Sequence, residues 1–72
     1  MKEYYFLTSS VTTAMKGEKI LSSNGFRAFV FRDGAINPYG CGYVIKAVGD
    51  RDAMADILKK WGVRINEIRE VP

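Results

Sequence analysis

Cys41 is the only cysteine in this 72-residue chain, and it lies between two glycines in the segment 39–43, Tyr-Gly-Cys-Gly-Tyr. A lone thiol forms no disulfide within its chain. The chain also has no histidine, and zinc sites usually need several Cys or His ligands at short spacings, so we predict no metal site and no cofactor. Two uses of the thiol stay open: a small buried side chain, as free cysteines often are, or a reactive nucleophile.

The composition indicates one small folded domain over residues 1–72. Hydrophobic residues make up 47% and charged residues 26% of the chain, which is ordinary for a globular domain. No apolar run approaches the roughly 20 residues that cross a bilayer, and the first residues lack a signal-peptide pattern. Because an unpaired cysteine suits a reducing compartment, we expect the protein in the cytoplasm and without membrane contact.

Hydrophobic periodicity and turn residues predict six elements in the order strand, helix, strand, strand, helix, strand. Ser9 and Ser10 supply capping hydroxyls for the first helix, and Asp50 supplies one for the second. The predicted segments are a strand over 3–8, a helix ending at 24–25, strands over 26–32 and 42–48 joined by a loop over 33–40, a helix from 50 to 62, and a strand over 63–71.

This order is the split βαβ pattern of the ferredoxin-like fold, an α+β sandwich. It predicts a four-stranded antiparallel sheet of order 4-1-3-2 with both helices on one face. In that topology the start of the third strand lies beside the end of the first strand. Cys41 is therefore expected to face the corner formed by Thr8, Ser9 and Ser10.

That corner would favour the ionised form of a thiol. The first turn of a helix exposes unpaired N–H groups and carries about half a positive charge, which lowers thiol pKa values. Gly40 and Gly42 have no side chains, so a second molecule could approach the Cys41 sulfur closely. The glycines are equally compatible with an ordinary hairpin.

The spacing of Ala14, Glu18, Leu21 and Gly25 along the first helix, followed by a loop that enters Cys41-Gly42, resembles the selenium/sulfur carrier protein-like family. The resemblance extends over about residues 4–68. It implies that the cysteine accepts a sulfur or selenium atom as a persulfide or selenide adduct.

In the resemblance, Ser9 and Ser10 match the family's polar helix start. Together with Gly40 and Gly42, which let a second molecule approach the sulfur, they form the expected substrate-binding surface. The family's Pro-Arg stretch after the second strand is missing here, and Arg32 is the one basic residue left in that region. The implied partners are donor and acceptor proteins of sulfur or selenium metabolism. The implied role is a carrier or accessory protein rather than a stand-alone enzyme.

Glu18 falls on the apolar stripe of the first helix, where an unpaired carboxylate would be costly. It lies about 12 Å along the helix axis from Ser10, too far for proton exchange with Cys41. We expect it to pair with a lysine or to bind a backbone group. On the second helix, Met54 and Trp61 are expected in the core.

The strand over 26–32 is apolar on both faces. Phe26, Ala28 and Val30 alternate with Arg27, Phe29 and Phe31, so aromatic rings remain on the face without helices. This pattern predicts a homodimer or a partner protein, and it supports an alternative function: a non-catalytic interaction module with a structural Cys41.

The same sheet architecture binds RNA when exposed aromatic rings stack on bases. Tyr4 or Tyr5, together with Tyr43, could play that part. The strand over 42–48 lacks the glycine-and-aromatic signature of such modules, and the net charge is only +3, so nucleic acid is not the expected partner.

Overall fold

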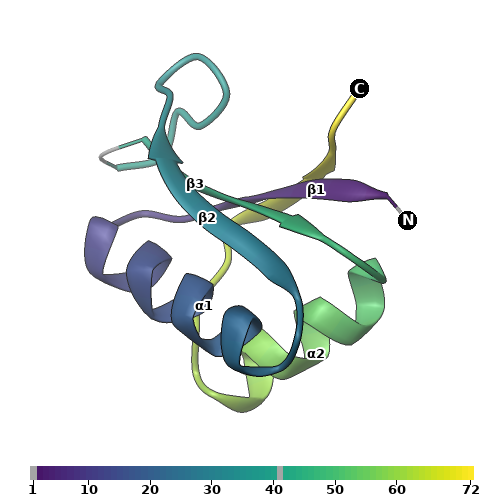
Figure 1. The fold of residues 1–72 in the computed structure, drawn as a ribbon. Coiled ribbons are helices and arrows are strands. Elements are labelled where there is room, and N and C mark those ends of the chain that lie inside the picture. The colour runs from purple at the N-terminus through teal and green to yellow at the C-terminus, as the bar shows by residue number, and fades with distance from the viewer. Residues whose placement is uncertain (1, 41) are drawn as a thin grey trace.

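The computed structural model describes residues 2–40 and 42–72 and has the predicted order of elements (Figure 1). The strands and helices are β1 (Glu3–Leu7), α1 (Val11–Ser23), β2 (Arg27–Arg32), β3 (Tyr43–Val48), α2 (Arg51–Lys60) and β4 (Glu67–Glu70).

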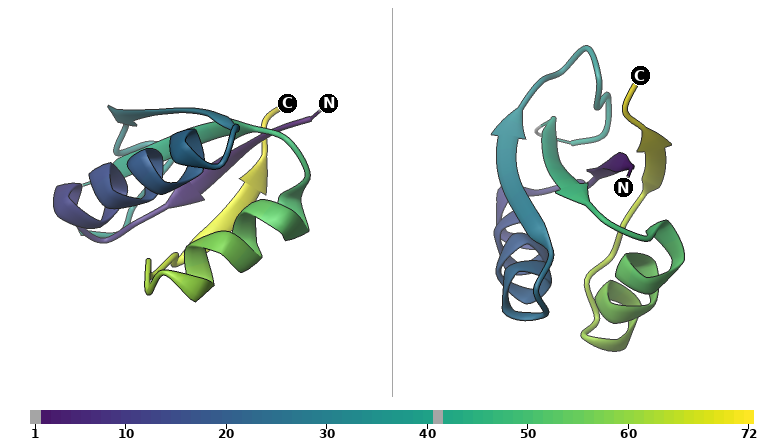
Figure 2. Two further views of the ribbon diagram at one scale, coloured as in Figure 1. Left: turned by 60° about the horizontal axis from the view of Figure 1, so that its bottom comes forward. Right: turned by 45° about the vertical axis from the view of Figure 1, so that its right-hand side comes forward.

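The strands form one antiparallel sheet in the order β2-β3-β1-β4, which is the predicted order read from the other edge. Both helices pack on the same face of the sheet (Figure 2). The ferredoxin-like α+β architecture is therefore confirmed.

The core lies between the sheet and the two helices. Along β1 and β3, alternate residues point toward the helices, and Phe6 and Ile45 are fully buried there as cross-strand partners. The remaining buried members of this cluster are Ala14, Leu21, Ala47, Met54, Leu58 and Val63. Tyr4 and Tyr43 pack against the same cluster, so they are not available for stacking on the open face.

Ser10 is the N-cap of α1, and its hydroxyl oxygen accepts a hydrogen bond from Thr13 N as predicted. The apolar period of this helix, Val11, Ala14, Glu18 and Leu21, predicts that Val11 is buried, but Val11 is 37% exposed, whereas Gly17 is buried. A Cβ at Gly17 would come within 2.6 Å of Ile45 Cδ1. Glycine therefore allows the helix to approach the sheet closely, and a periodicity count of apolar residues overlooks it.

Glu18 binds a backbone group, as expected. Its Oε2 accepts a hydrogen bond from Val30 N at 2.9 Å. Because α1 lies under β2, the half-buried carboxylate reaches the strand without leaving its helix.

Asp50 is the N-cap of α2 and accepts a hydrogen bond from Ala53 N. The helix buries Met54 as predicted. The core placement of Trp61 is wrong, because its side chain is 56% exposed. The helix ends at Lys60, and the chain reverses at Gly62, which has a φ of 72°. After this turn Val63, and not Trp61, enters the core.

The last strand is shorter than predicted. The alternating pattern suggested residues 63–71, but β4 covers Glu67–Glu70 only. Val63 N bonds to Leu58 O at 2.9 Å, so the start of this segment closes α2 instead of pairing with β1. Asn66 N then donates to Leu7 O at 2.8 Å and leads into the strand.

Residues 33–40 cover part of the sheet face that the helices leave open (Figure 1). Leu7 and Val44 are cross-strand partners on that face, yet both have no exposed surface. Arg69 donates from Nη1 to Ile36 O at 2.7 Å, which ties the loop to β4. The open face is thus closed at one end.

Candidate functional site

Four parts of the chain meet at one end of the sheet, called here the loop end: the end of β1, the start of α1, the loop over 33–40 and the start of β4 (Figure 1). Ser9 Oγ donates to Asn66 Oδ1 at 2.9 Å, which links the α1 start to β4. A Cβ on Gly40 would lie 2.0 Å from Ser9 O, so the loop packs directly on the same turn. The predicted position of this loop beside the end of β1 and the start of α1 is confirmed, whereas the participation of the β4 start was not predicted.

Cys41 itself lies outside the described residues, but its two chain neighbours are described. Gly40 has a φ of 51° and Gly42 a φ of 75°, and both values favour glycine. A Cβ on Gly42 would lie 3.3 Å from Asn37 O and from Gly34 Cα. The two glycines are therefore required by the backbone conformation and by close packing.

Asn37 holds the loop in place from the inside. Its side chain is 1% exposed, and its Nδ2 donates to the carbonyl oxygens of Thr8 and Tyr43. Its Oδ1 accepts from Tyr39 N at 2.9 Å. One buried amide therefore joins β1, β3 and the loop.

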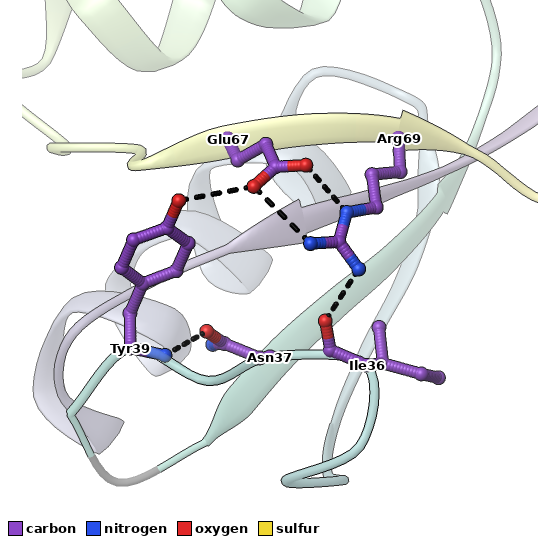
Figure 3. Close-up of polar contacts among 5 residues, drawn as sticks. All are labelled: Ile36, Asn37, Tyr39, Glu67 and Arg69. Carbon is purple, nitrogen blue, oxygen red and sulfur yellow. Dashed lines mark hydrogen bonds and ion pairs between the residues drawn. The ribbon is translucent and has the colours of Figure 1, made fainter.

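Tyr39 of the loop and Glu67 and Arg69 of β4 form a polar cluster that connects the loop to β4 (Figure 3). Tyr39 Oη donates to Glu67 Oε1 at 3.1 Å, and the Arg69 guanidinium binds both oxygens of that carboxylate. The guanidinium lowers the pKa of Glu67, and the hydrogen bond to Glu67 raises the pKa of Tyr39. A lowered carboxyl pKa contributes stability above its unfolded value, and this is lost as the pH falls through the folded value. Because these groups are exposed, the contribution is small.

The predicted substrate-binding hydroxyls have partners within the chain. Ser9 bonds to Asn66, while Ser10 both donates to Thr13 Oγ1 and accepts from Thr13 N. Arg32 is exposed at the end of β2, opposite Tyr43 on β3. The structure thus brings Gly40 against Ser9, the residue before Ser10, whereas Gly42 contacts Gly34 and Asn37 of the loop.

Sequence reasoning missed Asn37 and the cluster of Tyr39, Glu67 and Arg69. A buried asparagine in a turn-rich segment looks like any other turn residue. The spacing of Glu67 and Arg69 could have indicated that their side chains lie next to each other, because residues two apart on a strand share one face.

The uncovered part of the open face carries an aromatic cluster. Tyr5 and Phe31 meet edge to face with ring centroids 5.9 Å apart, and Phe29 lies 6.1 Å from Phe31. Lys46 Nζ lies 5.8 Å from the centre of the Phe29 ring. Phe29 is 52% exposed, so the predicted exposure of rings on this face is confirmed.

Within residues 2–40 and 42–72, no three His, Cys, Asp or Glu side chains gather as a metal ion would require. In the same part of the chain, neither helix has the length and apolar character to cross a membrane.

Comparisons with protein-family models, with curated proteins and with solved structures gave no match to this chain.

Proposed function

We propose that this protein is a thiol-dependent carrier or accessory protein that acts through Cys41. The observation that carries the proposal is the position of the flanking glycines. Gly40 packs on Ser9 O, one residue before the N-cap of α1, and Gly42 lies against Gly34 and Asn37. These contacts hold the residues on both sides of the thiol at the loop end of the sheet.

The charge distribution of α1 supports a role for an anion there. The first turn of α1 contains no acidic residue, whereas α2 has Asp52 in its first turn. The partial positive charge at the start of α1 is therefore not offset by its own side chains, and such a helix end favours a thiolate.

The proposed reaction moves one neutral sulfur or selenium atom. The Cys41 thiolate attacks the outer sulfur of a persulfide on a donor protein and forms a new S–S bond. The S–S bond within the donor breaks, and the donor cysteine leaves as a thiolate, so no external oxidant or reductant is needed. Attack by an acceptor thiolate on the outer atom of the Cys41 persulfide repeats the same exchange.

Mass spectrometry tests this function directly. After anaerobic incubation with a cysteine desulfurase and cysteine, the protein should gain the mass of one or more sulfur atoms at Cys41. The gain should vanish on treatment with a reductant and should be absent from Cys41→Ser. An unmodified Cys41, under conditions that label a known carrier, would contradict the proposal.

The helix charge gives a second test. Thr12 is exposed in the first turn of α1, and Thr12→Glu would place a negative charge there. We expect the pKa of the Cys41 thiol to rise and alkylation by iodoacetamide at neutral pH to slow by about two- to fivefold. Thr12→Gln is the matched neutral control and should react like the unmodified protein. Equal rates for the two variants would show that the helix does not act on the thiol.

The aromatic cluster favours a second candidate function, an interaction module with a structural Cys41. Tyr5, Phe29 and Phe31 form contiguous apolar surface on the open face, and such surface in a small domain often marks a binding site. If Cys41→Ser keeps every cellular partner while Phe29→Ser loses them, this candidate replaces the carrier.

A further inference from the structure

β2 is an edge strand, and its hydrogen-bonding pattern shows which backbone groups point outward. Asp33 N donates to Gly42 O at 3.0 Å, in line with the β2–β3 register. In an antiparallel ladder such bonded positions recur at every second residue. The odd-numbered residues of β2 therefore bond to β3, and the N–H and C=O groups of Ala28, Val30 and Arg32 point away from the sheet.

Glu18 occupies the middle of this free edge. Its Oε2 accepts from Val30 N at 2.9 Å, and this donor is the central one of the three outward positions. Unpaired edge groups are templates for another strand, and proteins often block them with charged side chains. Glu18 provides such a block from α1.

We propose that the free edge of β2 pairs with β2 of a second copy of this chain, antiparallel and centred on Val30, and that Glu18 limits this association by competing for Val30 N–H. The proposal does not depend on thiol chemistry at Cys41.

The side chains of β2 are self-complementary in this register. With Val30 opposite its own copy, Phe29 stands opposite Phe31 of the second copy. Arg27 stands opposite Asp33 of the second copy, the residue after β2, whose Oδ1 accepts from Ala35 N and Ile36 N and whose Oδ2 is left for Arg27. Both are non-hydrogen-bonded positions, where facing side chains come closest. Aromatic pairs and opposite charges at such positions stabilise a sheet.

The neighbouring antiparallel registers fit less well. A shift of two residues toward the start of the strand places Arg27 opposite Phe31 and removes its acidic partner. The pairing of opposite charges and of aromatic rings together therefore selects a second copy in the Val30-centred register.

The surfaces on both sides of the edge are apolar. Phe29 is 52% exposed on the open face, and Met15 is 58% exposed on α1, one turn before Glu18. A second copy at the β2 edge would take both side chains out of water. The eight-stranded sheet so formed would also join the aromatic clusters of the two copies.

The test compares the unmodified protein with Glu18→Ala and Glu18→Gln by analytical ultracentrifugation in the presence of a reductant. Glu18→Ala removes the competing acceptor in both copies of the symmetric dimer, so Val30 N–H is freed twice. We expect it to tighten self-association by at least about tenfold. Glu18→Gln retains an acceptor oxygen for Val30 N and should associate like the unmodified protein. Circular dichroism checks that each variant is folded.

Arg27→Glu tests the register and leaves Glu18 in place. The introduced carboxylate would face Asp33 of the second copy with a like charge. Arg27→Glu alone should therefore associate more weakly than the unmodified protein, and combined with Glu18→Ala it should cancel the gain of that variant. In NMR spectra, the amides of Ala28, Val30 and Arg32 should shift with protein concentration. The proposal is overturned if Glu18→Ala associates no more tightly than Glu18→Gln, or if Arg27→Glu has no effect. Because Cys41→Ser should dimerise unchanged, a failure here is distinct from a failure of the carrier function.

Discussion

Asn37→Asp is expected to destabilise the protein by about 3–5 kcal/mol at neutral pH, the usual cost of an uncompensated buried charge. The Asn37 amide nitrogen donates to two carbonyl oxygens, those of Thr8 and Tyr43, in a position that is 1% exposed. A carboxylate has no hydrogen to donate and would face both oxygens with its own negative charge. Chemical denaturation of the variant and the unmodified protein measures the difference.

The loss should depend on pH. Burial and the neighbouring oxygens raise the pKa of the introduced carboxyl above its unfolded value. A group with a raised folded pKa favours the folded state below the unfolded pKa, and this is lost as the pH rises through the folded value. The deficit relative to the unmodified protein should therefore be smaller at about pH 4 than at about pH 7.

Asn66→Asp is the matched control. Asn66 is exposed, and its Oδ1 accepts from Ser9 Oγ. A carboxylate would accept that bond equally well, so we expect a change within about 0.5 kcal/mol. Similar losses for the two variants would mean that Asn37 does not anchor the loop.

Gly40→Ala should cost about 2–4 kcal/mol, because strain at a positive φ adds to a steric overlap. The φ of Gly40 is 51°, and a Cβ there would lie 2.0 Å from Ser9 O. That oxygen belongs to the backbone beside the N-cap of α1, so it has little freedom to move. The loop must shift to admit the methyl group.

Two other glycines separate the contributions. Gly62 also has a positive φ, 72°, but nothing lies within 4 Å of its Cβ position, so Gly62→Ala measures backbone strain, about 1–2 kcal/mol. Gly34 has open space and no positive φ, so Gly34→Ala should be nearly neutral. If Gly40→Ala costs no more than Gly62→Ala, the close approach to Ser9 is not required for stability.

Local patterns carried most of the information about the fold. The Ser10 and Asp50 caps, the turn at Asn24-Gly25 and the alternating strands led to the observed order and to the sheet arrangement. The errors arose where tertiary contacts overrode periodicity. Trp61 continued the apolar stripe of its helix, but the chain reversal at Gly62 excluded it from the core. Val63 was counted in the last strand, although it completes the core beside α2.

The candidate site was predictable only in its location. The predicted strand order alone indicated that the loop over 33–40 lies beside the start of α1. The contacts that fix the loop depend on side chains far apart in sequence, such as Tyr39 with Glu67, and no local pattern indicates such a pair. Glu18 was an intermediate case. Its place on an apolar stripe predicted a bonded carboxylate, but not that the bond would reach the free edge of β2.

The burial of Leu7 and Val44 determines how the loop can move. Lifting residues 33–40 would transfer both side chains to water, at about 1.5–3 kcal/mol each, and would break the Asn37 bonds. In a domain of this size that is a large share of the total stability, typically about 5–15 kcal/mol. Opening of the loop is therefore a rare event in the folded protein. Under the proposed carrier function, a donor or acceptor protein would therefore bind the loop in its closed form.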